Sequence, residues 1–493
     1  MVMRIGGLAS GINTDEIIEK LMSAERMPLD RMEQDRTLLE WQRDGYREIY
    51  QKLYEMDNDL IFDMKLSSTY NSKTVSSSME SAVTATATSS AQNGAYSIKV
   101  DSLATSAINV GADLGKDFDP SKALNQATTV RFSTFNEKTQ AMEEHTVEVA
   151  ETDSLNDVLK KITNGDNNVR AFYDGTSNKV ILESTRTGNY NTEGNEIEFA
   201  DDSFFATTLQ LSQENEVNGT DATFTYNGVE FTSKQNSYTL NNVTFSFKNV
   251  TAGQTVSLTV DNNVDAAFDS IMNFVNKYNE IVESINGSQT QERYRDYKPL
   301  TEAQKKEMSD KEIELWEEKA KSGILRGESI LTSGMFDLRQ TWYSNVETGG
   351  EITSLTQVGI STGADYMNGG KLVVDEDKLK EALREDPAAV NKLFSNSTTD
   401  KNDPSRGLIN RLEDSMESMM KSIEERAGST TKNVLDTYTL GKRIKDLDTR
   451  ISNFEDRLLQ VESRYWSQFN AMEQAISRLN NQSSQLLSQF GGA

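Results

Sequence analysis

The side chains that could support catalysis are few in this chain. Its 493 residues include one histidine, His145, and no cysteine. Thiolate nucleophiles, disulfides and iron–sulfur clusters are therefore excluded, and so is any metal site that needs several histidines. Catalysis would have to use carboxylates, lysine or tyrosine. We expect His145 to occupy a solvated strand position rather than to act as a catalytic base.

Two segments start like ligand-binding loops but lack the residues that would complete them. Residues 369–372, Gly-Gly-Lys-Leu, have neither the upstream glycine nor the Ser or Thr after lysine that a phosphate-binding loop needs. Residues 261–265 begin like a calcium loop, but Ala266 replaces the turn glycine and Met272 replaces the bidentate acid. Neither segment predicts a ligand site.

The acidic residues suggest no catalytic pair. Residues 172–174, Phe-Tyr-Asp, and the pair Asp201-Asp202 could be compared with glycosidase carboxylates, but nothing sets them at a defined separation. All four tryptophans lie outside residues 42–315, so a sugar-binding platform in the middle of the chain would need Tyr or Phe. The sequence therefore predicts no enzyme, no cofactor and no metal site.

The charge excludes further classes of function. With 77 acidic and 51 basic residues, the net charge is −26, which argues against nucleic acid or an anionic membrane as the main partner. No run of about 18 apolar residues occurs, so no membrane insertion is expected. The N-terminus lacks the apolar stretch of a cleavable secretory signal. That lack favours a cytoplasmic protein, although export routes that read an uncleaved N-terminus leave no such mark.

Residue usage divides the chain into three stretches. Residues 1–75 and 265–493 are rich in Glu, Lys, Arg, Leu and Met at helical spacing, whereas residues 76–264 are dominated by Thr, Ser, Asn, Gly, Val and Phe. The expected order is therefore helix, sheet, helix. Such an insertion between two helical arms brings the ends of the chain together.

Local signals predict the elements of the middle stretch. Alternating residues predict hairpins around Asn227-Gly228 and Asn241-Asn242. A short helix with a Ser or Asp cap is expected at 153–162. Strands are expected beside it at 128–133, 145–150, 168–173 and 179–184. We interpret this stretch as two β-rich lobes, one inserted into the other.

The C-terminal arm has the clearest periodicity. Eight apolar residues step by four and three and form a heptad seam: Leu440, Ile444, Leu447, Ile451, Phe454, Leu458, Val461 and Tyr465. After a phase shift the stripe continues through Leu479, Leu486 and Phe490. A second seam runs from Leu39 to Leu60 with a weak point at Gly45. Two seams from opposite ends favour an intramolecular coiled coil; the alternative is an amphipathic helix packed on a globular core.

The N-terminal residues differ from both arms. Their apolar members are Ile5, Leu8 and Ile12, and the intervening Gly and Ser residues oppose an independent helix. Asn13 followed by Glu16 predicts an N-cap, so a helix should begin at Thr14 and be interrupted at Pro28. Residues 1–12 should stay disordered until a partner covers them.

Two ordered sets of residues resemble a known family. The first is residues 5–18, Ile-Gly-Gly-Leu-Ala-Ser-Gly-Ile-Asn-Thr-Asp-Glu-Ile-Ile, with Glu-Arg-Met-Pro-Leu at 25–29. The second includes Gly-Glu-Ser-Ile-Leu at 327–331 and Gly-Lys-Leu-Val-Val-Asp at 370–375. Both resemble the hook-associated protein 2 family of bacterial flagellar filament caps. Residues 128–184 are similar to the insert of flagellins and their relatives.

The resemblance implies a structural function. In this family, paired terminal helices form legs that fit the filament tip, and β domains form a plate above a helical domain. It implies a homo-oligomeric ring under which exported flagellin folds and inserts. The implied partners are further copies of the chain, flagellin, hook-filament junction proteins and a flagellar export chaperone. The cytoplasmic expectation then gives way to a secreted, extracellular protein at the distal tip of the flagellar filament.

We therefore expect an α+β, multidomain fold in four parts. They are a coiled-coil leg (1–44 with 436–493), partly disordered when free, a helical domain (45–75 with 265–435), a β-rich head domain (76–112 with 214–264) and a β-rich domain inserted in it (113–213). The leg residues expected to contact the filament or flagellin are Ile5, Leu8, Ile12, Ile17, Leu21, Leu479, Leu486 and Phe490. The alternative function is a surface adhesin whose β head binds host or environmental polymers.

Overall fold

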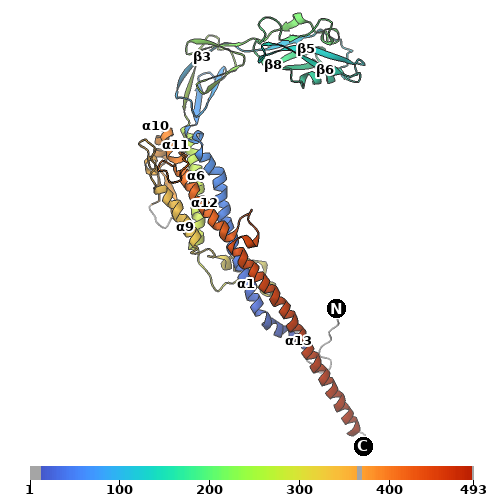
Figure 1. The fold of residues 1–493 in the computed structure, drawn as a ribbon, viewed down its shortest axis with the longest axis vertical. Helices are drawn as coiled ribbons and strands as arrows, with labels where there is room; N and C mark the ends of the chain where they lie inside the picture. Colours follow the sequence, from blue (N-terminus) through green and yellow to red (C-terminus); the bar gives the residue numbers. More distant parts are fainter. Residues whose placement is uncertain (1–12, 364–368, 491–493) are drawn as a thin grey trace. The chain divides into compact units, whose positions relative to one another are not determined.

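The computed structural model describes residues 13–363 and 369–490, and the chain divides into two compact units. Unit 1 joins the two ends of the chain, residues 1–70 and 267–493, and unit 2 is residues 71–266. Helices dominate unit 1 and strands dominate unit 2 (Figure 1). The expected α+β fold, with terminal helices and an inserted β-rich middle, is confirmed. The boundaries of the four-part division stay a prediction.

Unit 1 contains two long helices and several shorter ones. In chain order its helices are α1 (Thr14–Glu55), a π-helical turn (Met56–Ile61), α2 (Phe62–Lys65), α3 (Ser67–Asn71), α6 (Val264–Thr290), α7 (Glu302–Lys306), α8 (Asp310–Lys321), α9 (Ser329–Tyr343), α10 (Glu376–Glu385), α11 (Pro387–Ser395), α12 (Leu408–Ala427) and α13 (Thr439–Phe490). Short 3₁₀ turns lie at Leu355–Val358 and Leu435–Thr437, and β16 (Ile360–Thr362) pairs with β17 (Leu372–Val374).

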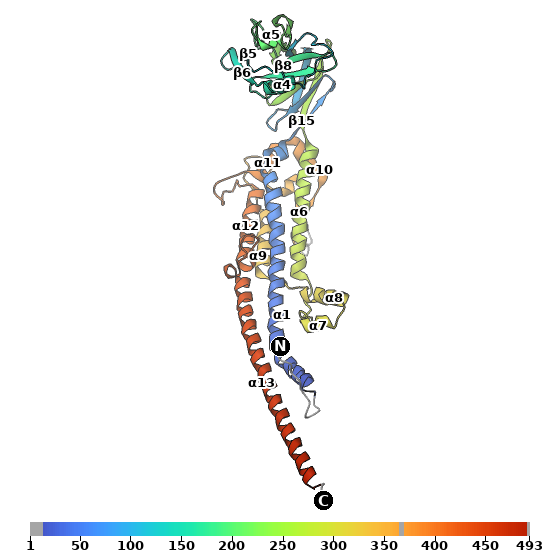
Figure 2. The same ribbon diagram turned by 90° about the vertical axis from the view of Figure 1, so that its right-hand side faces the viewer.

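Helices α1 and α13, from opposite ends of the chain, lie side by side (Figures 1 and 2). Arg36 Nε donates to Asp448 Oδ1 at 2.5 Å, and the Tyr465 hydroxyl donates to Glu25 Oε1 at 3.0 Å. Earlier residues of α1 thus contact later residues of α13, so the two helices are antiparallel. The first and last helices of the chain pair with each other, as the two seams predict.

The start of α1 follows its sequence signal, but its course differs from the prediction. Asn13 Oδ1 accepts a hydrogen bond from the backbone N–H of Glu16 at 3.3 Å, so α1 begins at Thr14 as predicted. The predicted interruption at Pro28 is wrong, because α1 continues to Glu55. A proline removes one backbone hydrogen bond and can bend a helix without ending it. In Figure 2 the N-terminal end of α1 turns away from the rest of the helix.

Gly45 marks a close contact of α1; its role as a weak point of the helix stays a prediction. A Cβ atom at this position would lie 3.1 Å from Cδ1 of Leu325, so glycine allows the segment before α9 to approach α1. The adjacent Tyr46 is fully buried, and its hydroxyl donates to Glu328 Oε2 at 2.7 Å. These contacts fix the start of α9 against α1.

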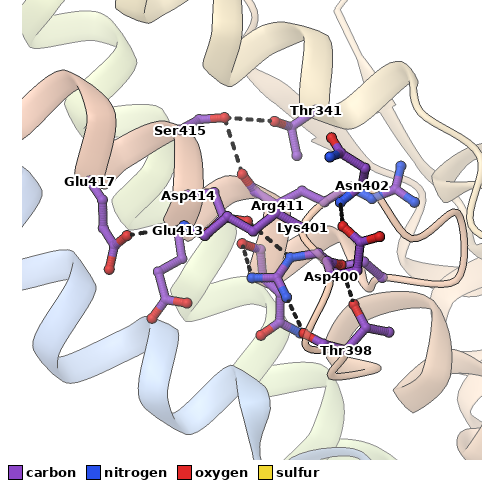
Figure 3. A network of polar contacts seen from close by, with 12 residues as sticks. Thr341, Thr398, Asp400, Lys401, Asn402, Arg411, Glu413, Asp414, Ser415 and Glu417 are labelled. Atoms are coloured by element: carbon purple, nitrogen blue, oxygen red, sulfur yellow. Dashed lines mark hydrogen bonds and ion pairs between the residues drawn. The ribbon is translucent and has the colours of Figure 1, made fainter.

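Charged side chains hold the loop between α11 and α12 against α12. Arg406 Nε donates to Asp414 Oδ2 at 2.9 Å, and Arg406 Nη1 donates to the carbonyl of Thr398 at 2.8 Å. Lys401 Nζ lies 2.5 Å from the other oxygen of Asp414 and 3.7 Å from Glu417 Oε2. Figure 3 shows Lys401 and Asp414 within this network. One carboxylate thus joins two cations of the loop to α12.

Unit 2 is built from antiparallel sheets. Its strands are β1 (Lys73–Ser77), β2 (Val83–Ala87), β3 (Gly94–Ser102), β4 (Ser106–Val110), β5 (Thr128–Asn136), β6 (Ala141–Val149), β7 (Val169–Asp174), β8 (Lys179–Thr187), β9 (Ile197–Glu198), β10 (Glu216–Val217), β11 (Ala222–Tyr226), β12 (Val229–Ser233), β13 (Ser237–Leu240), β14 (Val243–Phe247) and β15 (Val256–Asn262). The sheet orders are β1-β15-β3-β11-β12, β13-β14-β2, β10-β4-β8-β7 and β6-β5-β9. Two short helices, α4 (Leu155–Thr163) and α5 (Phe204–Thr207), accompany them.

Both predicted hairpins are confirmed. Asn227 and Gly228 have φ values of 47° and 87° between β11 and β12, and Asn241 and Asn242 have 49° and 65° between β13 and β14. Two consecutive positive φ angles define the type I′ turn, which Asn and Gly tolerate best. The four strands predicted around residues 128–184 are also present as β5 to β8.

Two separate hydrophobic clusters lie within unit 2. One gathers residues between Ala82 and Ala104 with residues between Ala222 and Val260. The other lies between Val130 and Leu211 and includes the apolar face of α4. Ser154 caps α4 as predicted: its hydroxyl accepts from the backbone N–H of Asp157, and the Asp157 carboxylate accepts from the backbone N–H of Ser154.

Candidate functional site

The single histidine, His145, lines a pocket of about 460 Å³ together with Glu144, Glu148, Lys161 and Asp166. His145 is on β6, where Nε2 lies 2.8 Å from the hydroxyl of Thr134 and the ring packs 5.4 Å from that of Phe132. It is half-buried, so the expected strand position is confirmed and the side chain is partly solvated, while Phe132 on β5 faces it across the sheet. Within the described residues, 13–363 and 369–490, no group of three or more acidic or histidine side chains could hold a metal ion.

The two segments that start like binding loops have structural roles. Asp261 belongs to β15 and pairs in register with Thr74 of β1. Lys371 Nζ lies 2.9 Å from Glu283 Oε2, and this partner holds the pKa of Glu283 below its usual value. Asp174 accepts hydrogen bonds from Ser177 at a turn, which lowers the pKa of its carboxyl. Each charge is used locally, and these residues form no common site.

The heptad seam of α13 is covered along its first part. Leu440, Ile444, Leu447, Leu458 and Val461 are buried, and Ile451, Phe454 and Tyr465 are half-buried. The apolar stripe thus faces α1 and the rest of unit 1 down to Tyr465, whose hydroxyl contacts Glu25. Burial of such a stripe is the main source of stability of an amphipathic helix.

Beyond Tyr465 the same helix keeps its apolar residues but loses its cover. Leu479 and Leu486 are 63% and 54% exposed, against 6% and 8% for Leu458 and Val461. Leu487, which the sequence pattern missed, is 70% exposed. The sequence could have indicated Leu487, because its position next to Leu486 widens the apolar face of the helix. We call Leu479, Leu486 and Leu487 the free stripe of α13.

The start of α1 carries the remaining predicted leg residues. Ile17 and Leu21 are each 37% exposed. Ile5, Leu8 and Ile12 lie outside the described residues, and Phe490 ends α13 without a description of its side chain. The structure therefore places four of the eight predicted contact residues, all of them exposed, on the terminal parts of α1 and α13.

The segment around the free stripe is nearly uncharged. Residues 467–487 contain two charged side chains, Glu473 and Arg478, in a protein whose net charge is −26. Large exposed apolar side chains in a segment poor in charge are typical of a surface that contacts another protein. No helix within the described ranges is both long and apolar enough to cross a membrane.

Comparison with known proteins gives one consistent answer. The family description "Flagellar hook-associated protein 2 C-terminus" matches residues 219–481, and "Flagellar hook-associated protein 2 N-terminus" matches residues 10–107. The first of these alone spans more than half of the chain.

Individual relatives carry the same name. A "Flagellar hook-associated protein 2" of Halalkalibacterium halodurans is 36% identical over 97% of this chain and 98% of its own length. One of Thermotoga maritima is 27% identical over 69% of this chain and 52% of its own length. The crystal structure of the D1-D2-D3 domains of the flagellar cap protein FliD from Escherichia coli has a TM-score of 0.58 at 19% identity, covering 82% of this chain and 99% of that one. That similarity shows a shared fold.

Proposed function

We propose that this chain is a structural cap at the distal tip of the bacterial flagellar filament, because it belongs to the flagellar hook-associated protein 2 family. The observation that supports particular contact residues is the exposure of the free stripe of α13. Leu479, Leu486 and Leu487 are exposed on a helix whose preceding stripe is buried. In the proposed function, these residues and Ile17 and Leu21 of α1 contact the filament.

The reversibility of that contact follows from its small size. Each exposed leucine contributes at most about 2 kcal/mol when it is buried, so a few such side chains form a contact that can also break. If residues of the leg become ordered only on binding, the conformational entropy that they lose weakens the contact further. A cap held in this way can release and rebind as subunits are added beneath it.

The remaining parts of the proposal concern partners and place. We infer a homo-oligomeric ring that promotes the folding and insertion of exported flagellin and prevents its loss, outside the cell. Hook-filament junction proteins and an export chaperone are further proposed partners. The cap needs no enzyme activity and no cofactor for this function, since the insertion of flagellin itself would drive the movement of the ring.

The test replaces two of the three leucines of the free stripe in a strain that lacks its own copy of this gene. We expect the Leu479→Ser/Leu486→Ser chain to fold, because both side chains are already exposed, but to leave flagellin in the medium instead of in filaments. Leu315→Ser on α8, where the leucine is 50% exposed, is the matched control and should restore filaments. Filaments of normal length from the double variant would overturn the assignment of the leg contacts.

The adhesin alternative gains no support from the relatives described above, which are named as hook-associated or cap proteins. Adhesion of unit 2 would be compatible with a cap, but no observation on its surface favours a polymer ligand.

A further inference from the structure

A small pocket in unit 1 collects positive charge. It lies between α1 and the segment that follows α6, and has a volume of about 300 Å³. Its lining consists of Arg31, Gln34, Asp35 and Leu38 from α1 and Arg293, Arg295, Tyr297 and Lys298 from the segment after α6. Four cations and one carboxylate thus surround one cavity of a protein whose net charge is −26.

These cations have no carboxylate partner in the described part of the chain. Arg31, Arg295 and Lys298 are exposed, and no ion pair within 4.0 Å joins them to any residue of 13–363 or 369–490. Arg293 is half-buried, and its Nη1 donates to the carbonyls of Ala320 and Ser322 at 2.6 and 3.0 Å, which are neutral acceptors.

An adjacent pocket, which shares Gln34, provides the contrast. It is lined by Glu33, Glu302, Glu317 and Asp448 with two cations, Arg36 and Lys305. There the charges pair within the chain: Arg36 with Asp448 at 2.5 Å, and Lys305 with Glu317 at 3.3 Å. Both cations of that pocket therefore have carboxylate partners within the chain, whereas the cations of the first pocket have none within the described residues. Figure 2 shows α7 and α8 beside α1.

The positive charges of the pocket also repel one another. Burial and the charge of Arg295 both lower the pKa of Arg293. A further cation, Lys319, contacts a residue of the lining, since its Nζ lies 4.9 Å from the ring centre of Tyr297. Asp35 is the one carboxylate in the lining and sits one helical turn after Arg31. A ligand carboxylate placed here would relieve the repulsion.

We propose that this pocket binds a short acidic segment of a protein partner. Guanidinium groups hold carboxylates through paired hydrogen bonds, and Leu38 and Tyr297 offer apolar contact to the backbone and side-chain stems of a peptide. An extended polyanion such as nucleic acid or a lipid surface would meet the acidic remainder of the chain, whereas a short segment reaches only the basic cavity. This inference goes beyond the capping contact of the free stripe and does not depend on it.

The test uses the full chain and a fluorescein-labelled peptide of alternating Asp, Glu and Gly residues, with binding measured by fluorescence anisotropy. We expect binding that weakens as salt is added and an about tenfold higher Kd for Arg295→Gln/Lys298→Gln, since two charge-assisted contacts are lost. Lys442→Gln/Arg443→Gln on α13 removes two exposed cations elsewhere in unit 1 and should leave the Kd unchanged.

Each other result would overturn the proposal. Equal Kd values for the parent chain and the pocket variant would place the peptide elsewhere. Binding of inorganic pyrophosphate without binding of the peptide would indicate a small-anion site. If the peptide does not bind to a parent chain that circular dichroism and thermal melting show to be folded, the four cations are ordinary solvated surface residues. None of these results affects the filament test of the free stripe.

Discussion

Two charged side chains are buried among the described residues, and each is held differently. Arg406 in unit 1 is 7% exposed and donates to Asp414 and to the carbonyl of Thr398. Glu196 in unit 2 is 2% exposed; one of its oxygens accepts from the backbone N–H of Tyr190, and the other has no partner among the described residues. Burial of a charge costs free energy where hydrogen bonds do not replace water, and burial accordingly raises the pKa of Glu196.

The Arg406 contact gives a prediction about stability. Asp414→Asn should destabilise unit 1 by about 2–3 kcal/mol, because the buried guanidinium loses its charged acceptor. The measurement is the midpoint of urea unfolding followed by tryptophan fluorescence, since all four tryptophans belong to unit 1. Asp436→Asn, which breaks an exposed ion pair with Lys445, is the control and should change stability by less than about 0.5 kcal/mol. Equal effects of the two substitutions would refute the role given to Arg406.

A second prediction concerns pH and Glu216 of β10. Its carboxylate accepts from the backbone N–H groups of Glu196 and Ile197, but burial outweighs these bonds and raises the pKa of Glu216 to about 7. A carboxyl with a raised pKa stabilises the folded state below its unfolded value of about 4.5 and loses that contribution as pH rises through 7. Relative to the parent chain, Glu216→Gln should therefore raise the melting temperature at pH 8 and leave it unchanged at pH 4.

The amide oxygen that Glu216→Gln introduces would still accept the two backbone hydrogen bonds, so the comparison isolates the charge. Calorimetry at both pH values measures it. A stabilisation that is the same at pH 4 and pH 8 would show that Glu216 ionises normally.

At the scale of elements, α13 allows a buried leucine and an exposed leucine of the same apolar stripe to be compared. Leu458→Ala should cost about 2–4 kcal/mol, because the side chain is buried in the helix pair. Leu479→Ala, further along the same stripe, should change stability by less than about 0.5 kcal/mol, because the side chain is already in solvent. Urea unfolding of unit 1 measures both. A similar loss for the two variants would mean that Leu479 is covered in solution.

The sequence predicted those elements that local signals specify. Asn227-Gly228 requires two positive φ angles, and Ser154 with Asp157 forms a reciprocal cap, so neither depends on distant residues. Pro28 was misjudged because its effect depends on tertiary packing, since α1 continues past the proline, and the contact of Gly45 with Leu325 could not be read from the sequence for the same reason. The basic pocket was invisible for the same reason, since Arg31 and Arg295 meet only in the folded chain.

The candidate site was partly accessible from the sequence. The heptad pattern identified the apolar stripe of α13. Only the structure shows that the part of the stripe with Leu479 and Leu486 is exposed. Periodicity alone gives the same signal for a buried seam and for an unpaired one. The contact roles of the eight leg residues stay a prediction until the filament test is made.

At the scale of the whole molecule, limited proteolysis should reveal the difference between paired and unpaired helix. Trypsin should cleave after Arg478, beyond the contacts with α1, before it cleaves after Arg450 or Arg457 in the paired part of α13. Peptide mass spectrometry of a time course identifies the sites. Simultaneous cleavage at all three arginines would contradict a C-terminal segment of lower local stability. All three are exposed, so they form a matched set.

The way the chain enters and leaves its two units sets an order of events during synthesis. Unit 2 is one uninterrupted segment, residues 71–266, and has all its sheet partners as soon as that segment is complete. Helix α1 is made first, but its partner α13 is made last. Closing a pair of such large sequence separation is slow. The growing chain therefore carries a finished β unit behind an N-terminal helix that lacks α13 until late in synthesis, and until then the part of the apolar face of α1 that α13 covers is open to any helper protein that recognises it.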